Sequence, residues 1–441
     1  MRGDRSTSTS ASASASLPEP SSGTAYRWVV LGIATFTQAA AAFFVQGVGA
    51  LGLHLQRDLH LSTTQLGLLL SAAQLVPLIG LSAAGALLDR HSERWVVGAG
   101  ACVVGAGLLV GSAAPGYASL LLVMLVVGAG YSTVQPGGSK SVAAWFAPSR
   151  RGLAMGIRQA GLPLGAALAS ASLPVLAEAY GLRSALVAGG LVALLGAGVF
   201  MAFHRRPPHG TTRTGGGPPI PLTTQLRERL RMLREPSMAR IMLSGTSLIS
   251  VQYGVGVLTV LHLHRTASVD ADTAAVVLVA AQGAGVAGRI CLAAWSDRAT
   301  SGRYASVRAC LVAVTAGTVA LMTPLGHSPT AACVVFVGLG FFGLGWYGPW
   351  VAYVAESAPP GRTGFALGLA MSVNQIAIVL APPALGLLID LTHGFTPAWG
   401  VLSALTAAAL VLTLDPRSPG HPGSDTQEHA SRAQGRPQKY A

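Results

Sequence analysis

Twelve apolar runs, each close to or above the roughly 18 residues that mark a membrane-spanning helix, recur along this chain. Of its 441 residues, 51% are hydrophobic and 10% are charged. A soluble domain carries about 25% charged residues. The charged residues also cluster between the apolar runs. The sequence therefore predicts an all-α membrane protein with twelve transmembrane helices.

The twelve predicted spans fall into two sets of six. They cover residues 28–50, 64–88, 95–113, 118–142, 153–178 and 184–203, then 238–263, 272–295, 306–325, 330–355, 364–389 and 397–414. We therefore expect an N-terminal bundle over 28–203 and a C-terminal bundle over 238–414. Residues 1–27 and 415–441 are predicted to be disordered tails. The linker, 204–237, ends in "TTQLRERLRMLRE", which predicts a basic amphipathic helix on the inner membrane face.

The net charge of +13 is distributed unevenly across the predicted loops. Of 29 Lys and Arg residues, 23 fall in alternate loops and tails, whereas three fall in the opposite loops and three inside spans. This asymmetry follows the positive-inside rule, and it predicts a multi-pass protein of the bacterial cell membrane with both termini in the cytoplasm. The basic charge therefore reports topology, and we do not expect nucleic-acid binding.

The two sets of six spans carry matching segments. "GALLDR" at the end of the second span matches "AAWSDR" at the end of the eighth, so that Asp89 aligns with Asp297. "RGLAMG" at the start of the fifth span matches "TGFALG" at the start of the eleventh. Parallel six-helix halves, related by an axis along the membrane normal, are the architecture of one large transporter class.

The segment "GALLDRHSER" resembles the signature of the loop between helices 2 and 3 in the major facilitator superfamily. The matching positions are Gly85, Leu87, Asp89, Arg90 and Arg94, while Ser92 replaces a glycine and Glu93 a basic residue. The resemblance covers residues 28–414 and implies the major facilitator fold, with two six-helix bundles. "WFAPSRRGLAMGIRQAGLPLG" and "GRICLAAWSDR" are similar to bacterial members near the cyanate/nitroimidazole and oxalate/monocarboxylate transporters.

The resemblance also implies a gating role for this motif, which holds the two halves together on the cytoplasmic side when the transporter faces outward. We expect close helix approach at Gly85 and Asp89 at the N-terminus of a facing helix. The predicted gate comprises Gly85, Asp89, Arg90 and Arg94, with a weaker copy in Asp297, Arg298 and Arg362. The alternative is a solvated loop with ordinary positive-inside charge.

Three cationic side chains lie within predicted spans, and no Asp or Glu lies deep in any of them. Arg289 is about 12 Å along its helix from Asp297, too far for an ion pair one turn away. Its possible partners are backbone carbonyls, the Gln282 amide, Glu356 at a span terminus, or an anionic substrate. Substrate contact and a structural tether therefore remain alternatives for Arg289. Arg158 either contacts the substrate or extends toward the cytoplasm, and Lys140 is expected to extend there.

Helices 1, 4, 7 and 10 line the central cavity according to the resemblance. Their polar and aromatic residues are candidates for substrate contact, since amides donate and accept hydrogen bonds and aromatic rings pack on apolar or planar groups. These candidates are Gln38, Gln46, Tyr131, Gln135, Gln252, Tyr253, Trp346 and Trp350. The alternative is hydrogen bonding between helices and anchoring at the membrane interface.

Prolines interrupt several predicted spans, where they form kinks or hinges. They are Pro163, Pro174, Pro349, Pro382 and Pro383. Three histidines, His54, His262 and His264, lie near the outer ends of helices, and we expect them at the membrane interface.

Neither a phosphate-binding loop nor an HExxH motif occurs, so we expect no enzyme activity and no cofactor. The sequence favours a monomeric secondary transporter for a small or medium organic anion, with a midplane site that Arg289 faces. One alternative is a proton-coupled exporter of drugs or metabolites, although such proteins often carry carboxylates in their spans. A second alternative is a membrane sensor that has lost transport.

Overall fold

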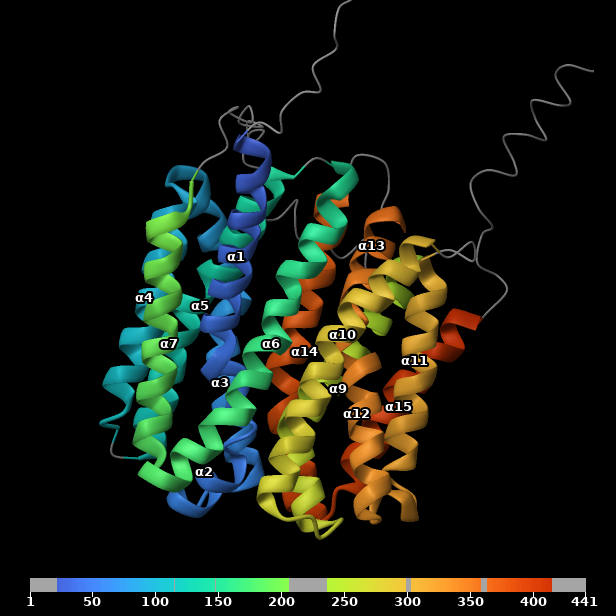
Figure 1. The fold of residues 1–441 in the computed structure, drawn as a ribbon. Coiled ribbons are helices and arrows are strands. Elements are labelled where there is room, and N and C mark those ends of the chain that lie inside the picture. Colours follow the sequence, from blue (N-terminus) through green and yellow to red (C-terminus); the bar gives the residue numbers. More distant parts are fainter. Residues whose placement is uncertain are drawn as a thin grey trace, which may run out of the picture.

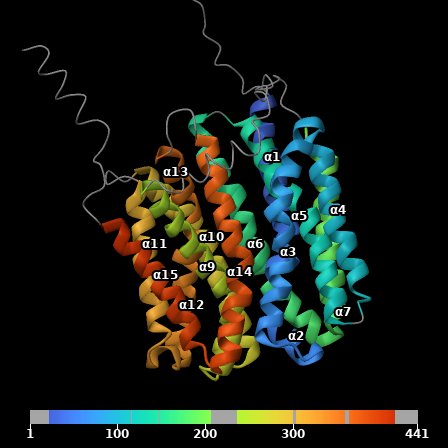
Figure 2. The same cartoon turned by 180° about the vertical axis from the view of Figure 1, so that it is seen from behind.

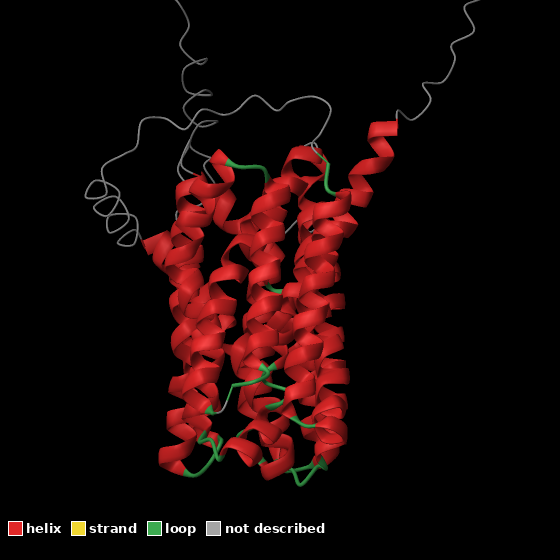
Figure 3. Ribbon diagram, turned by 90° about the vertical axis from the view of Figure 1, so that its left-hand side faces the viewer, coloured by secondary structure: helices red, strands yellow, loops and turns green. Residues whose placement is uncertain are grey.

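A computed structural model describes residues 22–114, 116–146, 148–205, 236–298, 303–357 and 363–414. These residues form long, nearly parallel helices, and no strand occurs among them (Figure 3). Eleven of the described helical segments are long and apolar enough to cross a membrane, and a shorter apolar helix spans Tyr304–Ala320. The predicted all-α membrane fold is confirmed. Most of the two predicted tails, and the predicted amphipathic helix, lie outside the described residues.

The N-terminal half contains the six predicted spans and one additional short helix. Its helices are α1 (Ser22–Gly47), α2 (Gly52–Leu59), α3 (Thr63–Arg90), α4 (Glu93–Gly111), α5 (Tyr117–Trp145), α6 (Pro148–Tyr180) and α7 (Leu182–Phe203). The first predicted span continued to residue 50, whereas α1 ends at Gly47 and a glycine-containing turn leads into α2. Glycine is a poor helix former, and three glycines between residues 47 and 52 favour this turn.

The C-terminal half has the same order of spans, with one of them broken. Its elements are α9 (Pro236–Arg265), α10 (Ala271–Arg298), α11 (Arg303–Ala320), η1 (Pro324–Gly326), α12 (Pro329–Gly345), α13 (Tyr347–Ser357), α14 (Thr363–Thr392) and α15 (Thr396–Leu414). The continuous helix predicted over 330–355 is interrupted at Trp346. Pro349 explains the break, since it has no N–H and its ring collides with the carbonyl four residues earlier, at Gly345.

The two halves stand side by side and meet along two crossed pairs of helices (Figures 1 and 2). α3 of the N-terminal half packs on α14, and α6 packs on α10. The matched sequence segments lie on these same four helices, α3 with α10 and α6 with α14. This crosswise pairing is the arrangement expected for two duplicated halves related by a pseudo-two-fold axis.

At the end of the molecule that carries α2, at the bottom of Figure 1, direct contacts join the halves. The Asp390 carboxylate at the C-terminal end of α14 accepts hydrogen bonds from the Thr63 and Thr64 amides at 3.1 and 2.7 Å. It also accepts one from Thr64 Oγ1 at 2.6 Å. A carboxylate is favourable at a helix N-terminus, so Asp390 caps α3 from the opposite half.

A second contact at the same end requires a glycine. A Cβ added to Gly49, in the turn after α1, would lie 2.0 Å from the carbonyl oxygen of Gly256 in α9. Only a residue without a side chain permits this approach of the two backbones.

His262 lies in the core of the C-terminal half, and its predicted location at the membrane interface is wrong. Its side chain is only 1% exposed. The Trp399 indole N–H donates to Nδ1 at 3.1 Å, and Nε2 lies 3.1 Å from the Gly326 carbonyl. Since the indole only donates, Nδ1 accepts and Nε2 carries the proton. Both ring nitrogens thus have partners in the core, which a position near the end of a helix did not indicate.

Candidate functional site

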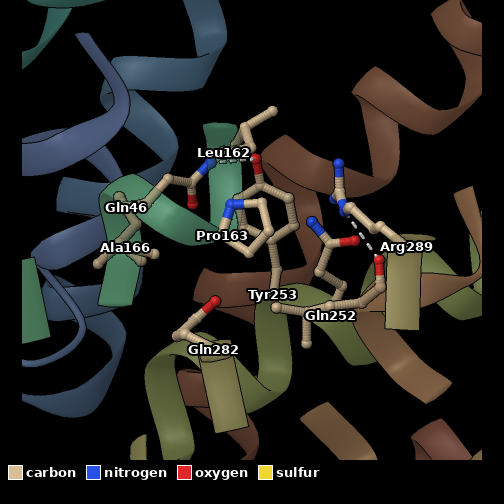
Figure 4. Close-up of a pocket in the computed structure, with 11 residues that line it drawn as sticks. Gln46, Leu162, Pro163, Ala166, Gln252, Tyr253, Gln282 and Arg289 are labelled. Carbon is tan, nitrogen blue, oxygen red and sulfur yellow. Dashed lines mark hydrogen bonds between the residues drawn. The ribbon is translucent and has the colours of Figure 1, made fainter. Parts of the chain in front are cut away.

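A small cavity lies between the two halves and is lined by both (Figure 4). The N-terminal half contributes Gln46, Leu70, Leu162, Pro163 and Ala166, and the C-terminal half contributes Gln252, Tyr253, Gly256, Gln282, Arg289 and Leu344. Its volume of about 20 Å³ leaves room for about one water molecule. The cavity in this structure is therefore too small for an organic ligand.

Arg289 on α10 borders the cavity and contacts both halves. Its side chain is 4% exposed. Nε donates to the Leu344 carbonyl at 3.0 Å, and Nη1 donates to the Gln159 carbonyl on α6 at 2.8 Å. The guanidinium also lies 5.7 Å from the centre of the Tyr347 ring. Of the partners predicted for Arg289, backbone carbonyls are those observed.

The third nitrogen of Arg289 differs from the other two. Within the described part of the chain, Nη2 has no hydrogen-bond partner. Figure 4 shows Gln252 and the Tyr253 ring between Arg289 and Gln46. Both donors of Nη2 are thus unused, and Arg289 is the only cation among the residues that line this cavity.

Arg158 on α6 is fully buried within the N-terminal half. Nη2 donates to Gln38 Oε1 on α1 at 2.9 Å and to the Gln135 carbonyl on α5 at 2.6 Å. Nη1 lies 3.3 Å from Gln159 Oε1, and Gln38 Nε2 donates to the Tyr131 hydroxyl at 3.1 Å. The extension of Arg158 toward the cytoplasm, one of the two alternatives, is wrong, because its charge is held by neighbouring helices.

Two further polar pairs lie at the cavity. Gln46 Nε2 donates to the Tyr253 hydroxyl at 3.4 Å, which links α1 to α9 across the halves. The Trp346 indole, at the break between α12 and α13, donates to Gln252 Oε1 at 3.3 Å. Trp350 is fully buried outside the cavity lining, and its indole donates to the Ile241 carbonyl at 2.9 Å. Trp346 is buried as well and is also absent from the residues that line the cavity, and its ring contacts that of Trp350, with the ring centres 5.3 Å apart.

The predicted gate lies at the end of the molecule opposite α2, and only part of it is described. Arg90, Arg94 and Arg298 are exposed there. A Cβ added to Gly85 meets no described atom within 4 Å, so the close approach expected at Gly85 is not observed. The side chains of Asp89 and Asp297, and the whole of Arg362, lie outside the described residues.

Lys140 on α5 extends as predicted toward the end opposite α2. Its Nζ donates to the Leu88 carbonyl at 2.6 Å and lies 3.5 Å from Glu93 Oε1, at the start of α4. The lysine therefore has both an acceptor and a countercharge.

Neither buried arginine has such a countercharge. The ion pairs found among the described residues involve His54, Arg57 and Lys140, and none involves Arg158 or Arg289. The described residues also contain no cluster of His, Cys, Asp or Glu that could hold a metal ion. Burying an unpaired charge is costly, and among the described residues carbonyls and amides, with the Tyr347 ring beside Arg289, stabilise these two guanidinium groups.

Sequence reasoning missed the role of Gln159, which contacts both arginines. Its side-chain oxygen lies 3.3 Å from Arg158 Nη1, and its main-chain oxygen accepts from Arg289 Nη1. One signal was present, because Pro163 follows four residues later and cannot bond to the Gln159 carbonyl. The identity of the residue that takes up this carbonyl depends on the tertiary fold.

Comparison with models of protein families finds a match along most of the chain. The model of the Major Facilitator Superfamily matches residues 31–382. An uncharacterized MFS-type transporter of Mycobacterium tuberculosis is 26% identical over 392 residues, which cover 89% of this chain and 85% of that protein.

Two similar proteins match over less than half of their length. The hexuronate transporter of Bacillus subtilis is 27% identical over 192 residues, or 40% of this chain and 43% of that protein. The probable L-galactonate transporter of Escherichia coli is 26% identical over 199 residues, or 43% of this chain and 44% of that protein.

The fold is similar to that of a solved bacterial homolog of the human lysosomal transporter Spinster, in an inward-facing and occupied conformation. The TM-score is 0.65 at 17% identity, over 89% of this chain and 92% of that one.

Proposed function

The chain belongs to the Major Facilitator Superfamily, and from this premise we propose that it carries a small or medium organic anion across the membrane by alternating access. The observation that carries the proposal is Arg289. This arginine borders a cavity between the halves, has no acidic partner among the described residues, and keeps Nη2 without a partner there. A guanidinium with unused donors is suited to a carboxylate, which accepts two parallel hydrogen bonds from it.

The charge balance of the spans supports an anion. Lys140, Arg158 and Arg289 lie within them, and no Asp or Glu lies deep in any span. Lys140 has Glu93 as a countercharge, whereas the two arginines have no acidic partner among the described residues. Surfaces of low dielectric constant strengthen the field of such charges, so the region between the halves carries a positive potential that attracts anions. This balance disfavours the alternative of a proton-coupled exporter with carboxylates in its spans.

The partial similarity to transporters of hexuronate and L-galactonate narrows the class of anion. Both compounds are sugar acids, with one carboxylate and several hydroxyl groups. In our proposal, Arg289 binds the carboxylate, and Gln252 and Tyr253, which also line the cavity, contact the rest of the substrate. Substrate contact by the other candidates stays a prediction: Arg158, Gln38, Tyr131, Gln135, Trp346 and Trp350.

A transport assay tests this function directly. Liposomes that contain the purified protein are loaded with unlabelled D-glucuronate and diluted into buffer that contains the radiolabelled compound. We expect them to accumulate the radiolabel in exchange for the unlabelled compound. Liposomes without protein and the Arg289→Gln variant serve as controls. If sugar acids and simple carboxylates are not exchanged, and a cationic drug is, the anion proposal fails and the exporter alternative replaces it.

We also propose that both termini are cytoplasmic in the cell membrane, and that the motif around Asp89 closes the cytoplasmic side of the interface. In a variant without native cysteines, cysteines introduced at Ser8 and Ser424 should resist a membrane-impermeant thiol reagent in intact cells. Labelling at either position contradicts the topology. For the gate, Asp89→Asn should reduce transport strongly while changing substrate affinity only a few fold, and unchanged transport would exclude the gate.

A further inference from the structure

Pro163 determines which atom holds Arg289. In a regular helix the amide of residue 163 would bond to the carbonyl of Gln159, but proline has no N–H, and its ring displaces the carbonyl four residues earlier. Pro163 lies inside α6. The carbonyl that this proline releases is the one that accepts from Arg289 Nη1 at 2.8 Å.

The second acceptor of Arg289 also comes from a helix interruption. Leu344 lies in the last turn of α12, which ends at Gly345. The last four carbonyls of a helix have no partner within it, so Leu344 offers a free oxygen, which Arg289 Nε binds at 3.0 Å. A proline inside the continuous helix α6 and the end of α12 therefore supply the two acceptors. They differ in position, since Leu344 belongs to the same half as Arg289 and Gln159 belongs to the other half.

The bond to Gln159 crosses the interface that must open during transport. The cavity beside Arg289 has a volume of about 20 Å³, which is too small for an organic anion. Admission of such a ligand therefore requires α6 and α10 to separate. Their separation lengthens and breaks the hydrogen bond from Arg289 to the Gln159 carbonyl.

We infer that Pro163 is a positioning residue: it presents the Gln159 carbonyl as an internal partner that holds Arg289 and ties the two halves together until an anion replaces it. The substrate anion and the carbonyl compete for one guanidinium, so binding and release of the interface are coupled. The anionic class of ligand rests on the proposed function. The tether itself, from Pro163 through Gln159 to Arg289, rests on the geometry alone.

The experiment compares two prolines of the same helix. Pro163→Ala restores the amide that competes with Arg289 for the Gln159 carbonyl. Pro174→Ala is the matched control, because Pro174 is also buried inside α6 and no described residue of the other half donates to the carbonyl four residues before it, at Ser170. Both changes are made in a variant without native cysteines.

Two measurements follow. Spin labels at Trp95 and Trp295, exposed residues of opposite halves near the end opposite α2, report the distance between the halves without any ligand. D-Glucuronate binding is measured by calorimetry. We expect Pro163→Ala to shift the ligand-free distances toward separated halves. We also expect it to raise affinity about 3- to 10-fold, as loss of an internal competitor should. Pro174→Ala should change neither quantity.

The outcomes distinguish the tether from the proposed function. Structural damage alone lowers affinity, and enlargement of the cavity at Pro163, which lines it, should leave the ligand-free distances unchanged. A rise in affinity together with a shift in the ligand-free distances is therefore specific to competition. If Pro163→Ala matches its parent or Pro174→Ala in ligand-free distances, the tether is excluded, even if D-glucuronate binds and is transported. If no organic anion binds but the distances shift, the tether stands and the proposed function fails. Should Pro163→Ala not fold, Arg289→Gln breaks the same bond and must shift the ligand-free distances in the same direction, or the tether is excluded.

Discussion

Arg158 and Arg289 are both buried, both without an acidic partner among the described residues, and both within reach of Gln159. They differ in what surrounds them. Every partner of Arg158 belongs to its own half, whereas Arg289 bonds to one carbonyl in each half. A charge bound within one rigid bundle stabilises that bundle, and a charge bound across two bundles responds when they move. We therefore expect the two arginines to fail in different ways when substituted.

The largest expected effect is on folding, at Arg158. Arg158→Met removes the donor of Gln38 Oε1 and leaves that buried oxygen unpaired. Loss of a charged donor from a buried acceptor should lower the free energy of unfolding by about 2–4 kcal/mol. Thermal unfolding in detergent measures this loss, with the exposed Arg94→Met as control. A variant that unfolds at the parental temperature but no longer binds substrate would remove the distinction between the two arginines.

The next effect is on transport, at Arg289. Arg289→Gln should weaken substrate binding by one to two decades, or about 1.5–3 kcal/mol, because it removes a charge-assisted contact. The substrate affinity of Arg289→Lys should lie between those of the parent and Arg289→Gln, since an ammonium keeps the charge but cannot form two parallel hydrogen bonds as the planar guanidinium does. Uptake into liposomes and the unfolding temperature are compared for the two variants. If Arg289→Gln mainly lowers the unfolding temperature and the surviving protein binds the substrate normally, Arg289 only stabilises the fold and does not bind the substrate.

The smallest effect is expected at Gln159, which contacts both arginines. Gln159→Ala keeps the main-chain carbonyl that binds Arg289, and it removes only the side-chain contact with Arg158 at 3.3 Å. We expect transport within about 3-fold of the parent and a loss of stability of about 1 kcal/mol or less. A loss of transport as large as that of Arg289→Gln would show that the Gln159 side chain, rather than its backbone, serves the site.

Much of the fold could be predicted because a membrane-spanning helix is specified by a continuous run of apolar residues in the local sequence. Long apolar runs located eleven spans and the shorter α11, and the repeat matched the helices that pair across the interface. The break at Trp346 was missed as a boundary, although Pro349 marked the place. The helix α2 was missed because its eight residues, "GLHLQRDL", have too little apolar length to be seen as a span.

The candidate site was predicted less completely, for a physical reason. Arg289 could be singled out because a charge inside an apolar run is rare and costly. The partners of Arg158 and His262 could not be found in this way, since acceptors such as Gln38 and the Gly326 carbonyl come from segments far apart in the sequence. Every residue type carries a backbone carbonyl, so the sequence does not show which carbonyls bind Arg289.

The main-chain partner of Arg289 also has an evolutionary consequence. Any residue at position 159 supplies the same carbonyl, so substitutions there preserve the contact and leave no correlated change at position 289. Methods that infer proximity from covariation among homologous sequences are therefore blind to this contact. The pair expected to change together is 163 with 289, a proline and an arginine that exchange no hydrogen bond. Homologues that lose one of them should tend to lose the other, even where position 159 varies freely.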